Sequence, residues 1–188
     1  LFGVVIMAPI GLVGALCHMV FHGIMKICSF FCAGAMMTQA HAVYVYELDG
    51  MAKKMPKVFA VFTVSALALM GVPGLCGFVS KWNLAKAAFL SGNLLAVVGV
   101  GGLLLSALLT AIYMLTIVIR AYVPGSDFEK SVQAKQGGFT QYNDTKRVTD
   151  PDWRMLFPLI LFAVAMFVIG VYSEPFVAFF TQVAEGLL

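Results

Sequence analysis

Long runs without a charged residue constrain this chain more than any other feature. Lys26 is the only Asp, Glu, Lys or Arg between Leu1 and Tyr46. Three further uncharged runs cover Val58–Ser80, Ala87–Ile119 and Met155–Ser173. A helix rises about 1.5 Å per residue, so each run is about long enough to cross the roughly 30 Å hydrocarbon core of a bilayer. The pattern predicts an all-α polytopic membrane protein with about four membrane crossings.

The composition agrees with a membrane protein and argues against several other classes. Hydrophobic residues make up 61% of the 188 residues and charged residues 11%, whereas about 25% of a soluble domain is charged. The formal net charge of +3 is too small and too dispersed to indicate nucleic-acid binding. Cys28 and Cys32 are four residues apart, but no His, Asp or Glu lies beside them on that helix face. We therefore interpret all four cysteines as small buried hydrophobic residues and predict no metal site and no cofactor in this chain.

The start of the chain resembles the inside of a longer membrane protein. Residues 1–8 look like the tail of a span. Pro9, Gly11 and Gly14 are expected to break or turn the chain before a first complete helix at Leu12–Met37. The first residue is already apolar and is not Met. We expect residues 1–188 to form a single transmembrane domain that is the C-terminal part of a longer polypeptide.

The second crossing is expected to be a discontinuous helix at Val58–Leu90. Its middle reads GVPGLCG, and a regular helix cannot continue through Pro73, Gly74 and Gly77, because proline lacks a donor and glycine loses the most entropy on ordering. Neither half alone is long enough to span a bilayer. Lys81 falls in the first turn after the break. Irregular backbone at membrane depth survives only where protein buries it or where it lines a water-filled cavity, so the break is itself a candidate site.

The remaining segments and the charges predict a topology. A third helix is expected at Leu94–Tyr122 and a last span at Met155–Tyr172, separated by a polar loop at 123–152. With four crossings, the linkers around Lys53 and Lys146 share one side, and nearly all Lys and Arg residues lie there. The positive-inside rule assigns this basic side to the cytoplasm.

A stripe of three polar residues crosses the first helix. His18, His22 and Lys26 are four apart, so on a helix they share a face, with about 6 Å between successive residues along the axis. A lysine near the bilayer centre costs about 2.5 to 3.5 kcal/mol on insertion scales, and Lys26 is far from both helix ends. Lys81 is singled out by its place beside the break. Lys86 is closer to a turn and can extend its side chain to the interface.

Buried lysines beside histidines fit proton relay better than other chemistry. Desolvation disfavours a charged lysine and a neighbouring charge changes that balance, so such a lysine can load and release a proton. A histidine can take up one proton and pass another along. A metal site is disfavoured, because no third ligand is evident and an ammonium group would repel the ion. Histidines satisfied by neighbouring helices are the structural alternative, and Glu174, before a proline at a helix end, is interpreted as a solvated carboxylate.

Three motifs together resemble a known family. The spacing of His18, His22 and Lys26, the segment MAKKMP at 51–56 and the segment GVPGLCGFVSK at 71–81 are similar to the antiporter-like subunits of respiratory complex I. They are also similar to the related subunits of membrane-bound hydrogenases and of Mrp-type cation/proton antiporters. The resemblance implies that the stripe belongs to a central hydrophilic axis and that Lys81 is the lysine of the broken helix on the proton-exit half. The family usually has a second proline where this chain has Gly74, and the first repeat, with its own glutamate and lysine, is absent here.

The resemblance implies a proton-translocating subunit of a redox-driven complex of the NADH-quinone oxidoreductase or hydrogenase type. The alternatives are a Na⁺/H⁺ antiporter subunit of the Mrp type and a structural membrane subunit whose polar axis is vestigial. The expected partners are other membrane subunits, the lipid bilayer, protons and Na⁺ as the alternative ion. The expected location is an energy-coupling membrane, with a bacterial or archaeal plasma membrane favoured. Since the chain has no GxGxxG, no CxxC pair and no nucleotide loop, any redox chemistry must reside elsewhere, and whether the chain counts as an enzyme stays open.

Overall fold

The described part of the chain is helical. The computed structural model describes residues 9–42, 44–123 and 148–187. Its α-helices are α2 (Pro9–Ala40), α3 (Pro56–Met70), α4 (Cys76–Leu90), α5 (Leu94–Tyr122), α7 (Trp153–Val171) and α8 (Glu174–Leu187). Two short 3-10 helices, η1 (Val45–Leu48) and η2 (Met51–Lys53), lie between α2 and α3. Over these residues no strand occurs, and the all-α prediction is confirmed.

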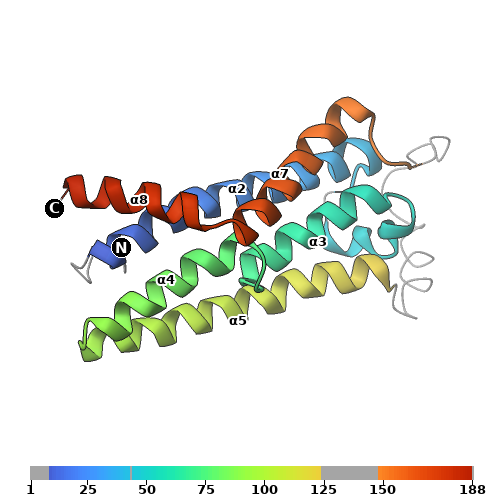
Figure 1. The fold of residues 1–188 in the computed structure, drawn as a ribbon. Helices are drawn as coiled ribbons and strands as arrows, with labels where there is room; N and C mark the ends of the chain where they lie inside the picture. Colours follow the sequence, from blue (N-terminus) through green and yellow to red (C-terminus); the bar gives the residue numbers. More distant parts are fainter. Residues whose placement is uncertain (1–8, 43, 124–147, 188) are drawn as a thin grey trace.

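The helices are arranged as four long rods that run in similar directions (Figure 1). Two rods are the single helices α2 and α5, whereas α3 continues into α4 and α7 continues into α8. α2 contacts α3, α4, α7 and α8, and α5 packs against α3 and α4. The buried side of α2 carries fully buried residues at a spacing of three or four, which are Cys17, Phe21, Met25, Cys28 and Cys32. This is the apolar stripe by which a helix joins a core, and all four cysteines of the chain are buried and free, as predicted.

The number of membrane crossings agrees with the prediction. Ile10–Ala40, Leu94–Tyr122 and Trp153–Val171 are each long and apolar enough to cross a membrane. α3 is apolar but has only 15 residues, so it needs α4 to complete a crossing. The described helices therefore account for about four crossings, one of them discontinuous.

The first helix begins earlier than the sequence indicated. Pro9 is the first residue of α2, and Gly11 and Gly14 lie inside the helix, so the predicted break or turn is wrong at Gly11 and Gly14. Proline is tolerated in the first turn because its missing N–H would have no helical partner there. Gly14 has a packing role instead, since a Cβ at this position would lie 3.1 Å from side-chain and backbone atoms of Leu84 on α4.

The predicted break in the second crossing is confirmed at Pro73 and Gly74, whereas Gly77 lies in the first turn of α4. α3 ends at Met70 and α4 begins at Cys76. Because α4 starts before Phe78, Lys81 lies in its second turn and not in the first turn after the break. The early start is possible because Gly77 has no side chain to collide with the end of α3.

A helix that the sequence reading missed follows the last predicted span. α7 ends at Val171, and α8 begins at Glu174 after a short turn and continues at an angle to α7 toward the other end of the bundle (Figure 1). Glu174 and Pro175 suit this position, because an acidic residue and a proline are both favourable in the first turn of a helix. The fold therefore contains two interrupted rods.

The connections meet at one end of the bundle. The backbone N–H of Gly50 donates to the carbonyl of Arg120 at the end of α5, over 3.1 Å. The carboxylate of Asp150 accepts the N–H groups of Lys57 and Val58 at the start of α3, over 3.2 and 3.3 Å. The α2–α3 linker, the end of α5 and the approach to α7 therefore share one end, as the topology prediction requires.

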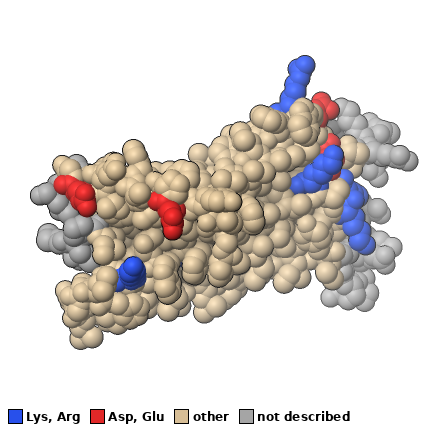
Figure 2. Space-filling view, viewed as in Figure 1, with Lys and Arg blue, Asp and Glu red and all other residues tan. Residues whose placement is uncertain are grey.

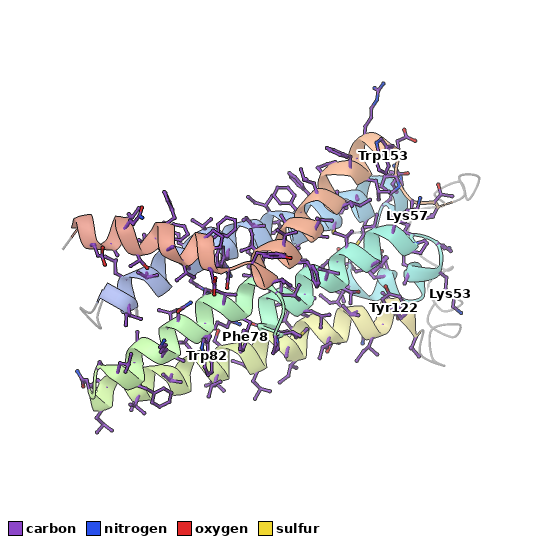
Figure 3. The ribbon with its side chains drawn as sticks, viewed as in Figure 1. Lys53, Lys57, Phe78, Trp82, Tyr122 and Trp153 are labelled. Carbon is purple, nitrogen blue, oxygen red and sulfur yellow. The ribbon has the colours of Figure 1, made fainter. Side chains whose placement is uncertain are left out.

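Basic and aromatic side chains gather at that end. Figure 2 shows most of the visible Lys and Arg side chains there, on a surface that is otherwise largely uncharged. Figure 3 places Lys53, Lys57, Tyr122 and Trp153 at the same end. Aromatic and basic residues are typical of a membrane interface. Residues 124–147, most of the predicted polar loop, lie outside the described residues.

Candidate functional site

The polar stripe of α2 lies against α4, beside the break. His18 and His22 are both partly buried, and their ring centroids are 5.4 Å apart. Nδ1 of His18 lies 2.9 Å from Oγ of Ser80, a fully buried residue on α4. Ser80 immediately precedes Lys81. One end of the stripe is therefore in hydrogen-bond contact with the helix that carries the second predicted lysine.

The end of α3 is closed by a left-handed turn. The last four carbonyls of a helix have no partner inside it. The N–H of Gly71, whose φ is +92°, donates to the carbonyl of Ala68, and the N–H of Val72 donates to that of Leu67, each over 3.1 Å. These are the two bonds of a Schellman motif. They leave the carbonyls of Leu69 and Met70 to be satisfied by another group.

Lys81 supplies that group from across the break. Its Nζ donates to the carbonyl of Leu69 over 2.7 Å and to that of Met70 over 2.9 Å. The negative end of the α3 dipole also favours a cation at this place. Lys81 therefore connects the two halves of the broken helix, because it belongs to α4 and its ammonium group bonds to the end of α3.

Two of the predicted break residues have roles that only glycine can fill. Gly74 has a φ of +90°, a conformation closed to proline, whose ring holds φ near −65°. A proline at this position would therefore require a different local geometry of the break. A Cβ on Gly77 would collide with the carbonyl oxygen of Ala68 and lie 3.0 Å from the sulfur of Met25. Pro73 is exposed within the break.

Lys26 follows Met25, whose sulfur lies close to Gly77 at the start of α4. It is partly buried, one helical turn beyond His22, and its ammonium group makes no hydrogen bond or ion pair with the residues described. Across the described ranges, no group of three His, Cys, Asp or Glu residues is placed to hold a metal ion. Of the four predicted residues, His18 contacts α4 through its hydrogen bond with Ser80, and Lys81 is held at the end of α3.

The sequence patterns did not single out two buried serine hydroxyl groups that lie close to the polar stripe. The Oγ atoms of Ser29 and Ser65 are 2.6 Å apart, and they lie 3.1 and 3.0 Å from the carbonyl oxygen of Met25. The spacing from Lys26 to Ser29 is helical and could have indicated a shared face. Ser65 and Ser80 are on other helices, and only the packing reveals their partners.

The family of the chain follows from a match over residues 1–115, more than half of its length. The matching family is described as "NADH:quinone oxidoreductase/Mrp antiporter, TM". The chain belongs to this family. The resemblance that rested on the stripe, the MAKKMP segment and the break is thereby confirmed.

Curated relatives match almost the whole chain but are much longer. NADH-quinone oxidoreductase subunit N of Desulforudis audaxviator (strain MP104C) is 32% identical over 180 residues, which cover 93% of this chain and 34% of the relative. NAD(P)H-quinone oxidoreductase chain 4, chloroplastic, of Chlorokybus atmophyticus is 30% identical over 182 residues, which cover 93% and 32%. The chain spans about a third of the length of these relatives.

A solved structure has the same fold. A chain in the "Structure of Mrp complex from Dietzia sp. DQ12-45-1b" matches with a TM-score of 0.77 over 97% of this chain and 39% of that chain. The sequence identity is 22%, so this similarity concerns the fold alone.

Proposed function

We propose that the chain is an ion-translocating part of an antiporter-like subunit and that it moves protons inside a redox-driven membrane complex of the NADH-quinone oxidoreductase or hydrogenase type. The proposed path runs through Lys26, His22, His18 and Lys81. The observation that carries the proposal is the contact between His18 and Ser80. This contact supports the proposal because it joins the helix of the stripe to the helix that carries Lys81.

The chemistry of each group suits a relay. A histidine can bind a proton at one ring nitrogen and release another from the second nitrogen. The hydroxyl of Ser80 holds the His18 ring, and it can act as donor or acceptor. Lys81 in its charged form is held by two carbonyls at the end of α3. Loss of its proton weakens these bonds, so proton release is coupled to the end of the broken helix.

Two alternative functions, Na⁺/H⁺ exchange and a purely structural role, predict different experimental results. The fold similarity to a chain of the Mrp complex motivates Na⁺/H⁺ exchange as the second candidate, for which transport would depend on sodium. If the polar axis is vestigial, substitutions in it would impair assembly without a separate transport defect.

Proton uptake into sealed vesicles that carry the intact parent complex tests the proposal. Turnover of the driving reaction is recorded in parallel. Lys26→Ala is expected to abolish uptake while the protein still assembles, because the substitution removes the first proton carrier. Lys86→Ala is the control, since this lysine is exposed on α4 and lies outside the path. Unchanged uptake in Lys26→Ala would contradict the relay.

Lys81 needs a variant that separates its two roles. Lys81→Ala would remove a proton carrier and two hydrogen bonds to the end of α3 together. Lys81→Arg keeps a cation and its donors, but a guanidinium group does not release its proton. We expect Lys81→Arg to assemble and to lose uptake. Normal uptake in this variant would show that Lys81 only caps the helix.

A further inference from the structure

The turn between α7 and α8 lies beside the break between α3 and α4. A Cβ on Gly170, near the end of α7, would collide with the carbonyl oxygen of Gly74 and with the backbone of Leu75. Glu174 follows four residues later and opens α8. Since α3 and α4 have 15 residues each, the break marks the middle of the bundle. Glu174 therefore lies near the middle of the bundle's length, away from the basic end.

Glu174 lines a groove of about 560 Å³ between α4 and the α7–α8 rod. Its side chain is exposed and makes no hydrogen bond or ion pair within the part of the chain that the structure describes. Ionisable residues at membrane depth almost always face the interior of a bundle or a water-filled cavity, and they pair with one another. An outward-facing carboxylate at this depth calls for a partner.

Neighbouring side chains in the groove present further acceptors. The hydroxyl of Thr181 donates its hydrogen to the carbonyl of Val177 over 2.8 Å, so its oxygen retains free lone pairs. The amide of Asn83 donates to the carbonyl of Val79 over 2.9 Å, which leaves its Oδ1 as an acceptor. The groove that Glu174 lines therefore contains further oxygen atoms that can accept hydrogen bonds.

The α4 wall of the groove is aromatic. Phe78 and Trp82 stack with ring centroids 5.8 Å apart and an interplanar angle of 18°, and both line the groove (Figure 3). The Trp82 side chain is 60% exposed. The face of an indole ring attracts a lysine or arginine cation. A carboxylate on one wall and an indole on the other thus favour the same kind of ligand.

We propose that this groove binds a transmembrane helix of another membrane subunit, and that the helix places a lysine or arginine between Glu174 and Trp82. The small residues Gly74, Gly170 and Ala178 line the groove and allow a helix to approach closely. The proposal rests on the proposed role inside a multisubunit complex. It concerns assembly and leaves the proton path unchanged.

Site-specific photocrosslinking in the intact complex identifies the occupant. A photoreactive phenylalanine analogue replaces Ala178, and the adduct is mapped by mass spectrometry. The expected adduct is a helix of another subunit with a Lys or Arg within about one turn of the linked residue. Lipid adducts alone, an adduct within the same polypeptide, a helix without a cation or no adduct would overturn the proposal. The same analogue at Leu104, which is 68% exposed on α5, is expected not to link to that helix.

The charge of Glu174 is tested by its neutral isostere. Glu174→Gln is expected to weaken association with the crosslinked subunit by at least about tenfold, because it leaves the partner's cation unpaired. Glu185→Gln, an exposed glutamate near the end of α8, is expected to have no effect. Exchange of the two charges between the subunits is expected to restore association. Wild-type association in Glu174→Gln would overturn the proposal. Proton uptake per assembled complex should match the wild type, so the outcome is independent of the relay.

Discussion

Gly77 has no side chain, and this allows the start of α4 to lie close to the end of α3 in the broken crossing. Gly77 packs against the end of α3, where a Cβ would collide with the carbonyl of Ala68. We expect Gly77→Ala to lower the free energy of unfolding by about 1 to 3 kcal/mol, because α4 must move away from α3. Thermal unfolding of the purified protein in detergent measures this loss.

The control for Gly77 is Gly34, a helical glycine of α2. A Cβ there would have no atom within 4 Å, so Gly34→Ala is expected to be neutral or to stabilise the helix by about 0.5 to 1 kcal/mol. Equal melting temperatures for the two variants would show that the close approach at Gly77 does not limit stability.

Ser80 is the residue through which the stripe meets α4. Ser80→Ala removes the hydroxyl that holds His18, and a net hydrogen bond is worth about 1 kcal/mol. We expect proton uptake to fall about fivefold while the complex still assembles. Ser80→Thr keeps a hydroxyl and is expected to retain more uptake than the alanine variant. If the two variants lose uptake equally, packing around residue 80 and not the hydrogen bond is responsible.

At the scale of the element, the start of α3 depends on a carboxylate from a distant segment. Met55 precedes the helix and forms no side-chain cap bond, whereas Asp150 accepts the N–H groups of Lys57 and Val58. Asp150→Ala is expected to destabilise the protein by about 0.5 to 2 kcal/mol, as loss of an N-cap does. Thermal unfolding of Asp152→Ala provides the matched comparison, because Asp152 precedes α7 and makes no cap bond. Equal losses in both variants would rule out the capping role.

Local chemistry explains which elements could be predicted. The break was readable because Pro73 beside Gly74 strongly disfavours a regular helix through local chemistry alone. Gly14 was misread because a glycine that breaks a helix and a glycine that admits Leu84 look the same in sequence. The residues of the stripe were predictable from spacing. Their contact with Ser80 was not, since it depends on how α2 packs on α4.

On the scale of the whole molecule, the two interrupted rods meet at their interruptions. Gly170 packs on the break near Gly74, so the unpaired backbone of one rod lies against the other rod. On the α2 side of this meeting point lie Lys81 and His18, and on the outer side lies the groove with Glu174. Backbone without helical bonds is tolerated at membrane depth only under such cover. The proposed proton path and the proposed docking surface therefore lie on two sides of the same packing contact.

The gathering of basic residues at one end predicts how the molecule is inserted. Positively charged loops remain in the cytoplasm, so the end with Lys53 should be cytoplasmic and the turn at Ser91 should face outward. Lys53→Cys and Ser91→Cys place exposed thiols at opposite ends, and the four native cysteines are buried. In intact cells a membrane-impermeant maleimide is expected to label Ser91→Cys alone. After permeabilisation it should label both variants, which shows that each thiol is reactive. Labelling of Lys53→Cys in intact cells would reverse the orientation, and with it the side from which protons enter the axis.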